Sequence, residues 1–205
     1  MDLYTHDRQF LDDNTKYIAG VDEAGRGPLA GPVCVASVIM PLDEDKILID
    51  VNDSKKLSEK KREFLFDKII DLAISYKIEM VDEDTIDKIN ILNATKLGMK
   101  NSILGLDTKP DIVLIDAVKL DIDCRTNPII HGDAISYNIA CASILAKVTR
   151  DRYIKEISDT YPEYNFAKNK GYGTKEHIEA LKKYGACKIH RETYLKNFNI
   201  SKYAK

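Results

Sequence analysis

Apolar residues fall along the chain in two patterns, short β-branched runs and longer stretches with helical spacing. The short runs predict strands at residues 17–22, 32–40, 76–81 and 111–116. The last of these, DIVLID, is apolar without alternation, which is typical of a strand covered on both faces.

Apolar residues three and four positions apart predict the helices. A long helix from about Ser136 to Tyr161 is expected to end at Pro162. Ser58 is expected to cap a helix that runs to about Ser75, with an inward face of Phe64, Leu65, Ile69, Leu72 and Ala73. Further helical patterns cover residues 91–104, with Gly105 as the stop, 175–184 and 191–198.

The resulting order, β-β-α-β-α-β-α-α, predicts an α/β fold with a mixed central β-sheet flanked by helices. The opening pair of strands resembles a hairpin, which argues against a purely parallel dinucleotide-binding fold. We expect a main domain over residues 1–161 and a small helical C-terminal extension over residues 162–205.

The composition indicates a globular protein without a membrane anchor. Of the 205 residues, 44% are hydrophobic and 31% are charged. No apolar run approaches the roughly 18 residues that a membrane span needs. Residues 1–16 lack the apolar core of a secretory signal, so we expect a cytoplasmic protein. The cysteines form no C-x-x-C pair, which predicts reduced and mostly buried thiols at Cys34, Cys124, Cys141 and Cys187.

The net charge of −2 conceals an asymmetry. Residues 147–205 hold 14 Lys and Arg against 7 Asp and Glu, so the rest of the chain carries a balance of −9. This division suggests one surface for an anionic polymer and another with clustered carboxylates. Two solvated helical faces would give the same balance.

Acidic residues stand where strands end or where the long helix is about to begin. Asp22 and Glu23 end the first strand, and Asp116 ends the strand DIVLID. Asp133 precedes the long helix, which it could simply cap, and the other three could be ordinary turn acids. Because sites in α/β sheets gather at strand ends, we expect the four carboxylates to converge. Mg²⁺ or Mn²⁺ would relieve their repulsion, and two such ions about 4 Å apart can cleave a phosphodiester.

Two loops carry residues that could contact phosphate. Residues 23–31 contain three glycines and a proline, and Gly25, Arg26 and Gly27 could cradle a phosphate. The segment matches neither a P-loop nor a dinucleotide fingerprint, so a structural turn is an equal alternative. Lys55 and Lys56 could bind phosphate or be solvated.

Further candidates lie in the C-terminal third of the chain. Tyr172 stands between two glycines, where an aromatic ring can stack on a sugar or a base, or pack a turn. His177 and His190 lack metal-ligand spacing and are interpreted as structural. Three basic residues lie on the predicted long helix, and an ordinary exposed helix face explains them nearly as well as a phosphate contact does: Lys147, Arg150 and Arg152.

Together these segments resemble ribonuclease HII, the bacterial type 2 ribonuclease H. The matching blocks occur in the order of that family and cover residues 17–195, nearly the whole chain. They are residues 20–32 (GVDEAGRGPLAGP), 53–57 (DSKKL), 115–116, 132–133, 139–151 (IACASILAKVTRD) and 170–174 (KGYGT), with His177, His190 and Arg191.

The resemblance implies a ribonuclease H-like fold and a metal-dependent endoribonuclease. The implied substrates are RNA/DNA hybrids and DNA duplexes with embedded single ribonucleotides, cut to a 5′-phosphate and a 3′-hydroxyl. It assigns two Mg²⁺ or Mn²⁺ ions to Asp22, Glu23, Asp116 and Asp133, with Asp22 shared by both ions. It assigns recognition of the ribose 2′-OH to residues 25–27, where a Cβ would block the sugar, and stacking on the sugar to Tyr172.

Two positions depart from the family pattern. Many members have Gly where this chain has Ala117, and many have Lys where it has His131. Neither change removes a carboxylate, although the loss of that Lys could weaken a phosphate contact. Residues 199–205 show no clear sliding-clamp peptide, and nothing in the sequence requires a protein partner or more than a monomer.

Two alternatives remain. Ribonuclease HIII is a related enzyme, but it carries an extra N-terminal domain and lacks Gly-Arg-Gly in the opening loop. This chain has about 16 residues before its first strand and has the Gly-Arg-Gly sequence. A non-catalytic module that binds RNA/DNA hybrids would be expected to lack a carboxylate, and none is missing here.

Overall fold

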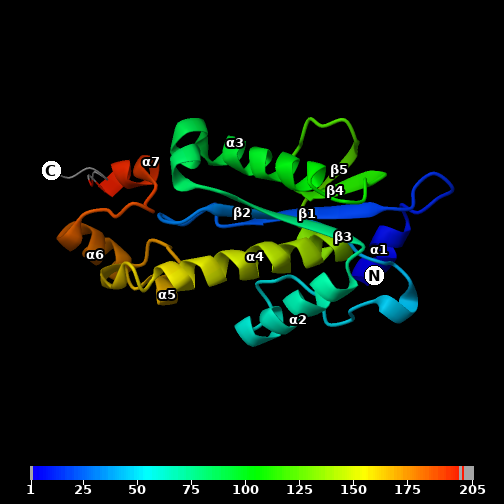
Figure 1. Ribbon diagram of the computed structural model, residues 1–205, viewed down its shortest axis with the longest axis horizontal. Helices are drawn as coiled ribbons and strands as arrows, with labels where there is room; N and C mark the ends of the chain where they lie inside the picture. The colour runs from blue at the N-terminus through cyan, green and yellow to red at the C-terminus, as the bar shows by residue number, and fades with distance from the viewer. Residues whose placement is uncertain (1, 199, 201–205) are drawn as a thin grey trace.

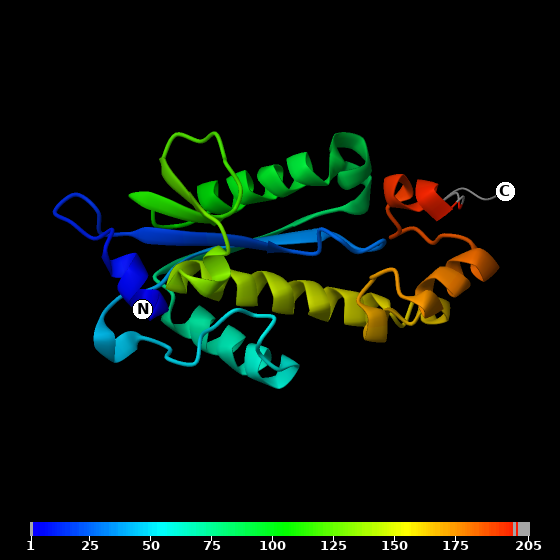
Figure 2. The same ribbon diagram turned by 180° about the vertical axis from the view of Figure 1, so that it is seen from behind.

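The computed structural model, which describes residues 2–198 and 200, is built on one five-stranded sheet (Figures 1 and 2). The strand order is β3-β2-β1-β4-β5. The strands are β1 (Ile18–Ala24), β2 (Val33–Ile39), β3 (Ser75–Val81), β4 (Ile112–Asp116) and β5 (Arg125–Ile129). β2 is antiparallel to β1 and β3, whereas β4 is parallel to β1 and β5. The mixed sheet and the hairpin-like opening predicted from sequence are therefore confirmed.

Helices cover both faces of this sheet. α4 lies along one face with α2 outside it, and α3 lies along the other (Figures 1 and 2). The shorter α5, α6 and α7 follow at the far end of α4, next to the loop between β1 and β2 (Figure 1). The helices are α1 (Leu3–Arg8), α2 (Glu59–Leu72), α3 (Glu83–Leu104), α4 (Tyr137–Ile157), α5 (Phe166–Asn169), α6 (Lys175–Tyr184) and α7 (Glu192–Leu195).

α4 packs closely against the central strand because of one glycine. A Cβ on Gly20 would overlap the backbone of Asn138 and Ile139, so only glycine allows the helix to approach β1 this closely. The first turns of α4 are buried on nearly every side, between the sheet and α2. This contact fixes the start of α4 relative to the strand that carries Asp22.

A buried carboxylate ties the N-terminus of the chain to the start of α4. Asp7 in α1 is fully buried and accepts hydrogen bonds from Ser136 Oγ, Asn138 N and Asn138 Nδ2. The Asn138 Oδ1 atom in turn accepts from Met40 N, just after β2. The sequence did not predict α1, because this short helix is stabilised by these tertiary contacts rather than by an apolar face of its own.

The strand β5 was also absent from the sequence prediction. Its residues, RTNPI, lack alternating apolar positions and include Pro128. Proline has no N–H to donate to a sheet, which restricts it mainly to edge strands, and β5 lies at the edge and pairs with β4 alone.

Several predicted helix boundaries and faces needed correction. α2 ends at Leu72, and it buries Leu65, Phe66 and Ile69. Phe64, expected to face inward, is 52% exposed because Phe66 occupies the inner face two positions later. Ser58 does cap this helix, by accepting from Lys61 N, as predicted.

Two further helices start or stop away from their predicted positions. α4 ends at Ile157, and Pro162 instead begins a short 3-10 turn. α3 begins at Glu83 rather than at residue 91, but a break at Asn90 (φ 65°) divides it. The Asn90 side chain accepts from Asn93 N and so caps the second part, which corresponds to the predicted helix.

Other expectations have mixed outcomes. Cys34 and Cys141 are buried free thiols, whereas Cys124 and Cys187 are only partly buried. Among the described residues, none of the helices has the length and apolar character to cross a bilayer. Most of residues 199–205, considered for a sliding-clamp peptide, lies outside the described residues.

The residue after β4 adopts a strained backbone. Ala117 has a φ of 51°, in the left-handed region that costs a residue with a Cβ about 1–2 kcal/mol. Its N–H donates to the carbonyl oxygen of Ile129, the last residue of β5, and so ties the end of β4 to the neighbouring strand. Glycine would adopt this conformation without strain.

We therefore predict that Ala117→Gly raises the free energy of unfolding by about 0.5–1 kcal/mol, the strain relieved less the extra entropy of an unfolded glycine. Urea denaturation measures this change. The matched control is Ala167→Gly in α5, an exposed helical position, where a loss of about 1 kcal/mol is expected. Equal losses in both variants would show that the Ala117 backbone is not strained.

Candidate metal and nucleic-acid site

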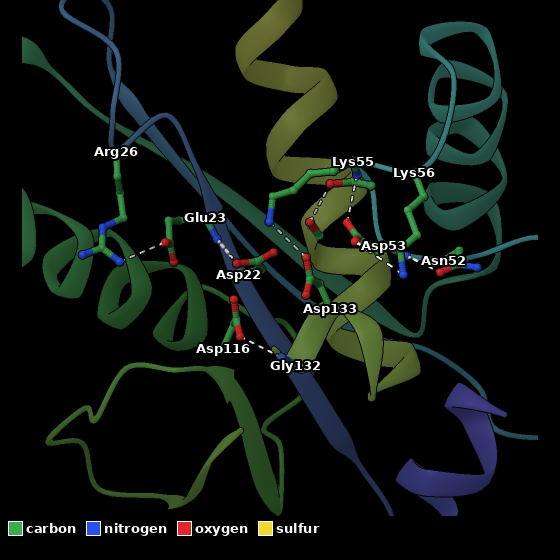
Figure 3. Close-up of polar contacts among 12 residues, drawn as sticks. Asp22, Glu23, Arg26, Asn52, Asp53, Lys55, Lys56, Asp116, Gly132 and Asp133 are labelled. Atoms are coloured by element: carbon green, nitrogen blue, oxygen red, sulfur yellow. Dashed lines mark hydrogen bonds and ion pairs between the residues drawn. The ribbon is translucent and has the colours of Figure 1, made fainter. Parts of the chain in front are cut away.

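The strand register places two of the predicted carboxylates at the same level. β1 and β4 run parallel, with Val21 opposite Ile115. Asp22 and Asp116 are the next residues on these two adjacent strands, so they lie side by side. The backbone N–H of Gly132, which follows β5, donates to Asp116 Oδ1 at 2.7 Å. This bond draws the loop that carries Asp133 to the same edge of the sheet (Figure 3).

Each of the other two carboxylates meets a basic side chain. Arg26 donates to Glu23 Oε1 at 3.3 Å, and Lys55 Nζ lies 3.3 Å from Asp133 Oδ2. Figure 3 shows Lys55 extending among the four carboxylates from the loop before α2. The structure therefore brings Asp22, Glu23, Asp116 and Asp133 to one region, as the sequence predicted.

A hollow of about 250 Å³ opens beside these groups. Three of the carboxylates line it, together with the glycine loop, Lys55 and Tyr172. Lys56 does not line this hollow and points toward Asp53, 3.9 Å away (Figure 3). Of the two lysines proposed from sequence, only Lys55 is therefore placed to meet a ligand in the hollow.

Two residues of α4 that were not among the predicted site residues also line the hollow. Ser143 shares a 2.9 Å hydrogen bond with Ser54, and its hydroxyl favours the ionised form of Asp22. Lys147 lies one turn later and pairs with Asp151 at 2.8 Å. Their spacing of four residues places them on one helix face, and that spacing was the available sequence signal.

Burial and mutual repulsion favour protons on these carboxylates. The pKa of Asp22 is raised well above its ordinary value by burial, and by the charges of Glu23 and Asp116. Burial also raises the pKa of Glu23, against the opposing charge of Arg26. The pKa of Asp116 is raised by burial, which outweighs the hydrogen bond from Gly132. A nearby cation would relieve this cost for all three groups.

The donor set fits a hard divalent cation. Glu23 Oε2 is buried and has no hydrogen-bond partner within the described residues, and the neighbouring donors are carboxylate oxygens. Across residues 2–198 and 200, no three His, Cys, Asp or Glu side chains are already gathered at metal-binding spacing. Binding an ion would therefore require the carboxylates to turn toward one another.

Two buried arginines hold the glycine-rich loop between β1 and β2. Arg150 of α4 donates to the carbonyl oxygens of Pro32, Ala30 and Lys170, each at 3.0 Å. The sequence interpretation of Arg150 as part of an exposed basic face is therefore wrong, because the side chain is 1% exposed. The neighbouring charged residues Lys147, Asp151 and Arg152 gave no sign of this burial.

Arg191 completes the support from the C-terminal side. Its guanidinium donates to the carbonyl oxygens of Gly25, Arg26 and Gly31 at 2.6–2.9 Å. Burial lowers the pKa of Arg191 to about 10, and repulsion by Arg150 adds to this, so the group remains charged at neutral pH.

The two glycines proposed to read the ribose differ in their surroundings. Gly25 has a φ of 96°, and a Cβ there would clash with the Arg150 side chain, so the protein itself requires this glycine. At Gly27 a Cβ would meet only Tyr172 Cε1, at 3.7 Å. The Tyr172 ring is 45% exposed and lies beside Gly27 at the edge of the hollow. Packing within the protein therefore explains the glycine at position 25 but not the one at position 27. For Gly27, the space required by a sugar remains as the proposed reason.

The strand order, the flanking helices and the acidic edge of the sheet define an α/β protein with a ribonuclease H-like fold. The model of the family "Ribonuclease HII" matches residues 19–197. A "Ribonuclease HII" of Caldicellulosiruptor bescii is 58% identical over 192 residues, which is 93% of this chain and 92% of the relative.

Two solved structures are similar in fold and sequence. One is the ribonuclease H2 of Pyrococcus horikoshii OT3, with a TM-score of 0.77 and 29% identity over 87% of this chain and 93% of that one. The other is the PCNA:RNase HII complex of Archaeoglobus fulgidus, with a TM-score of 0.74 and 27% identity over 87% and 94%.

The chain belongs to the ribonuclease HII family. It is accordingly a nuclease of the ribonuclease H type, which acts on RNA/DNA hybrids.

We predict that Arg191→Lys lowers the free energy of unfolding by about 2–4 kcal/mol, because one ammonium cannot reach the three carbonyl oxygens that the guanidinium satisfies. Urea denaturation measures the loss. The matched control is Arg152→Lys, an exposed ion pair with Glu63, where less than about 1 kcal/mol is expected. Similar small effects at both positions would mean that the loop does not depend on Arg191.

Proposed function

We propose that this chain hydrolyses the RNA strand of RNA/DNA hybrids and nicks DNA duplexes on the 5′ side of single embedded ribonucleotides. The products carry a 5′-phosphate and a 3′-hydroxyl. The observation that supports this proposal is the hollow in which carboxylates, the glycine loop and Tyr172 lie together. Residues 1–161 form the catalytic domain in this proposal, and residues 162–205 form its helical C-terminal extension.

Asp22, Glu23, Asp116 and Asp133 are proposed to hold two Mg²⁺ or Mn²⁺ ions, with Asp22 shared. When bound, such ions supply the activation of a water and the stabilisation of the departing 3′ oxygen. The unpartnered Glu23 Oε2 and the raised pKa of Asp22, caused by burial and by neighbouring carboxylates, support this assignment.

The remaining residues of the hollow bind and orient the substrate. The backbone of residues 25–27 meets the ribose 2′-OH and the adjoining phosphate, and the Tyr172 ring stacks on the sugar. Lys55 contacts a phosphate from the opposite side of the hollow. Lys56 shares this role in the prediction from sequence, but its orientation toward Asp53 does not support it.

The function is tested with a labelled DNA duplex that contains one ribonucleotide, incubated with Mg²⁺ or Mn²⁺ or with chelator. We predict nicking 5′ of the ribonucleotide only when metal is present. We also predict that Asp22→Asn lowers the rate by at least about 10³-fold and leaves duplex binding intact, because it removes charge that stabilises the reacting centre. Asp13→Asn, at an exposed position outside the hollow, is the matched control and keeps full activity.

The other outcomes favour the two alternatives. Cutting of long hybrids without nicking at single ribonucleotides would favour a ribonuclease HIII-type enzyme. Binding without cleavage of either substrate would favour a non-catalytic hybrid-binding module.

We predict that Gly27→Ala preserves folding and lowers nicking at a single ribonucleotide by about 10- to 100-fold, the cost of roughly 1–3 kcal/mol in substrate contacts. The physical reason is that the new methyl group meets no backbone within the described residues and lies 3.7 Å from Tyr172 Cε1, next to the ring proposed to stack on the sugar. Thermal unfolding and nicking rates are measured together. Gly25→Ala is the comparison variant, because it should lose stability as well as activity. Full activity of Gly27→Ala would count against ribose recognition by this loop.

A further inference from the structure

Two buried histidines lie directly behind Tyr172. His177 is in the first turn of α6, His190 lies just before α7, and both side chains are fully buried. Their Nε2 atoms are 3.0 Å apart. Tyr164 packs edge-on against His190 with ring centroids 4.8 Å apart, and Phe166 packs against His177 at 5.3 Å. These aromatic rings separate the imidazoles from water.

The backbone atoms at each end determine which nitrogen carries each proton. His177 Nδ1 lies 2.9 Å from the carbonyl oxygen of Tyr172, which can only accept, so this nitrogen donates. The backbone N–H of Cys187 points at His190 Nδ1 at 2.9 Å, and the Cys187 thiol, which can also donate, lies 3.1 Å from it. The Cys187 carbonyl oxygen is farther from this nitrogen, at 3.3 Å, so Nδ1 is assigned as the acceptor. With both rings neutral, His190 Nε2 must donate to His177 Nε2. The bonds therefore run in one direction from Cys187 to Tyr172.

Burial and the backbone groups at each end of the pair disfavour a second proton on these rings. Burial lowers the pKa of His177, which disfavours the charged form. Burial also raises the pKa of the Cys187 thiol to about 12 and that of Tyr164 to about 12, so neither group supplies a negative charge to stabilise an imidazolium. If His177 took up a second proton, its Nε2–H would point at the Nε2–H of His190, 3.0 Å away between the nitrogens. The charge nearest in sequence, Arg191, is positive.

The backbone before Tyr172 is already held, because Gly171 N donates to Asn169 Oδ1 and Gly171 O accepts from Leu29 N. The hydrogen bond from His177 adds restraint at the carbonyl group of Tyr172 itself. Tyr172 stands between Gly171, which has a φ of 83°, and Gly173. Glycine gives the backbone wide conformational freedom, so the direction of the Tyr172 ring depends on what binds its peptide groups. Its N–H donates to Asn169 O, and its carbonyl accepts from Thr174 N and from His177.

We propose that His177 and His190 are positioning residues that hold the Tyr172 ring over the hollow through a one-directional chain of hydrogen bonds. This inference rests on the proposed function, since it assigns a purpose to the placement of Tyr172. Arg191, next to His190, holds the glycine loop, which also lines the hollow. The segment from Cys187 to Arg191 thus sets the spacing between the two parts proposed to grip the ribonucleotide.

The first test is a two-bond ¹H–¹⁵N correlation spectrum of protein labelled with ¹⁵N-histidine. His177 is expected as the Nδ1–H tautomer, the minor form of a free imidazole, and His190 as the Nε2–H tautomer. Both are expected to keep these patterns as the pH is lowered from 8 to 6. Exposed His131 serves as the internal reference for an imidazole in contact with water. An Nε2–H tautomer at His177, or a protonated ring at neutral pH, overturns the proposal.

The second test separates positioning from general stability. His177→Leu, which cannot donate to Tyr172, is expected to raise KM for the ribonucleotide duplex about five- to tenfold at nearly unchanged kcat, the range of a weakened stacking contact. His177→Asn restores most of the loss, since its Nδ2 can replace Nδ1 as donor. Leu181→Ala, at a buried position of the same helix, is the control that loses stability without touching Tyr172.

Combination with Tyr172→Ala completes the test. If the histidine acts through Tyr172, His177→Leu raises KM no further in the Tyr172→Ala background. Additive effects of the two changes overturn the proposal. An unchanged KM in Tyr172→Ala alone also overturns it, while metal-dependent nicking by that variant would leave the proposed function standing.

Discussion

The candidate site depends on two buried guanidinium groups that bind the inward-facing carbonyl oxygens of the loop between β1 and β2. A loop with left-handed glycines turns its carbonyls away from any neighbouring strand or helix, and those oxygens must find donors elsewhere. Arg150 and Arg191 supply them, from α4 and from the segment before α7. The two positive charges repel each other, so the loop and its arginines stabilise one another only as a set. The C-terminal segments are for this reason part of the site and not an appendage to it.

Much of the fold could be predicted from apolar patterning, and the failures share one physical cause. The strands with continuous apolar runs were found, because burial on both faces leaves a strong signal in sequence. β5 is polar and contains Pro128, and its place at the sheet edge is set by pairing with β4. α1 depends on Asp7 reaching Asn138, a contact between residues 131 positions apart in the chain. Phe64 and Phe66 are equally apolar, and only the position of α4 decides which one is buried.

The site shows the same division between residue type and placement. The four carboxylates and Tyr172 could be named from the resemblance to a family, and the register of β1 and β4 explains why Asp22 and Asp116 are neighbours. The burial of Arg150 could not be recognised, because a basic residue on a long helix usually lies in solvent. Gly25 was expected to be glycine for the sake of the ribose, whereas its left-handed backbone and the Arg150 side chain already require it. A glycine required by interior packing cannot be distinguished, in the sequence alone, from a glycine required by ligand recognition.

That overlap has an evolutionary consequence for positions 25 and 150. Any side chain at position 25 would occupy the volume of the Arg150 guanidinium, and any shorter residue at position 150 would leave the carbonyls of Ala30 and Pro32 without their donors. Neither residue can be replaced while the other is unchanged. Whichever substitution comes first, the intermediate has either a steric clash at position 25 or unpaired carbonyl oxygens in the loop. Packing against a helix more than a hundred residues away in the chain thus restricts the loop sequence, independently of any selection for the substrate.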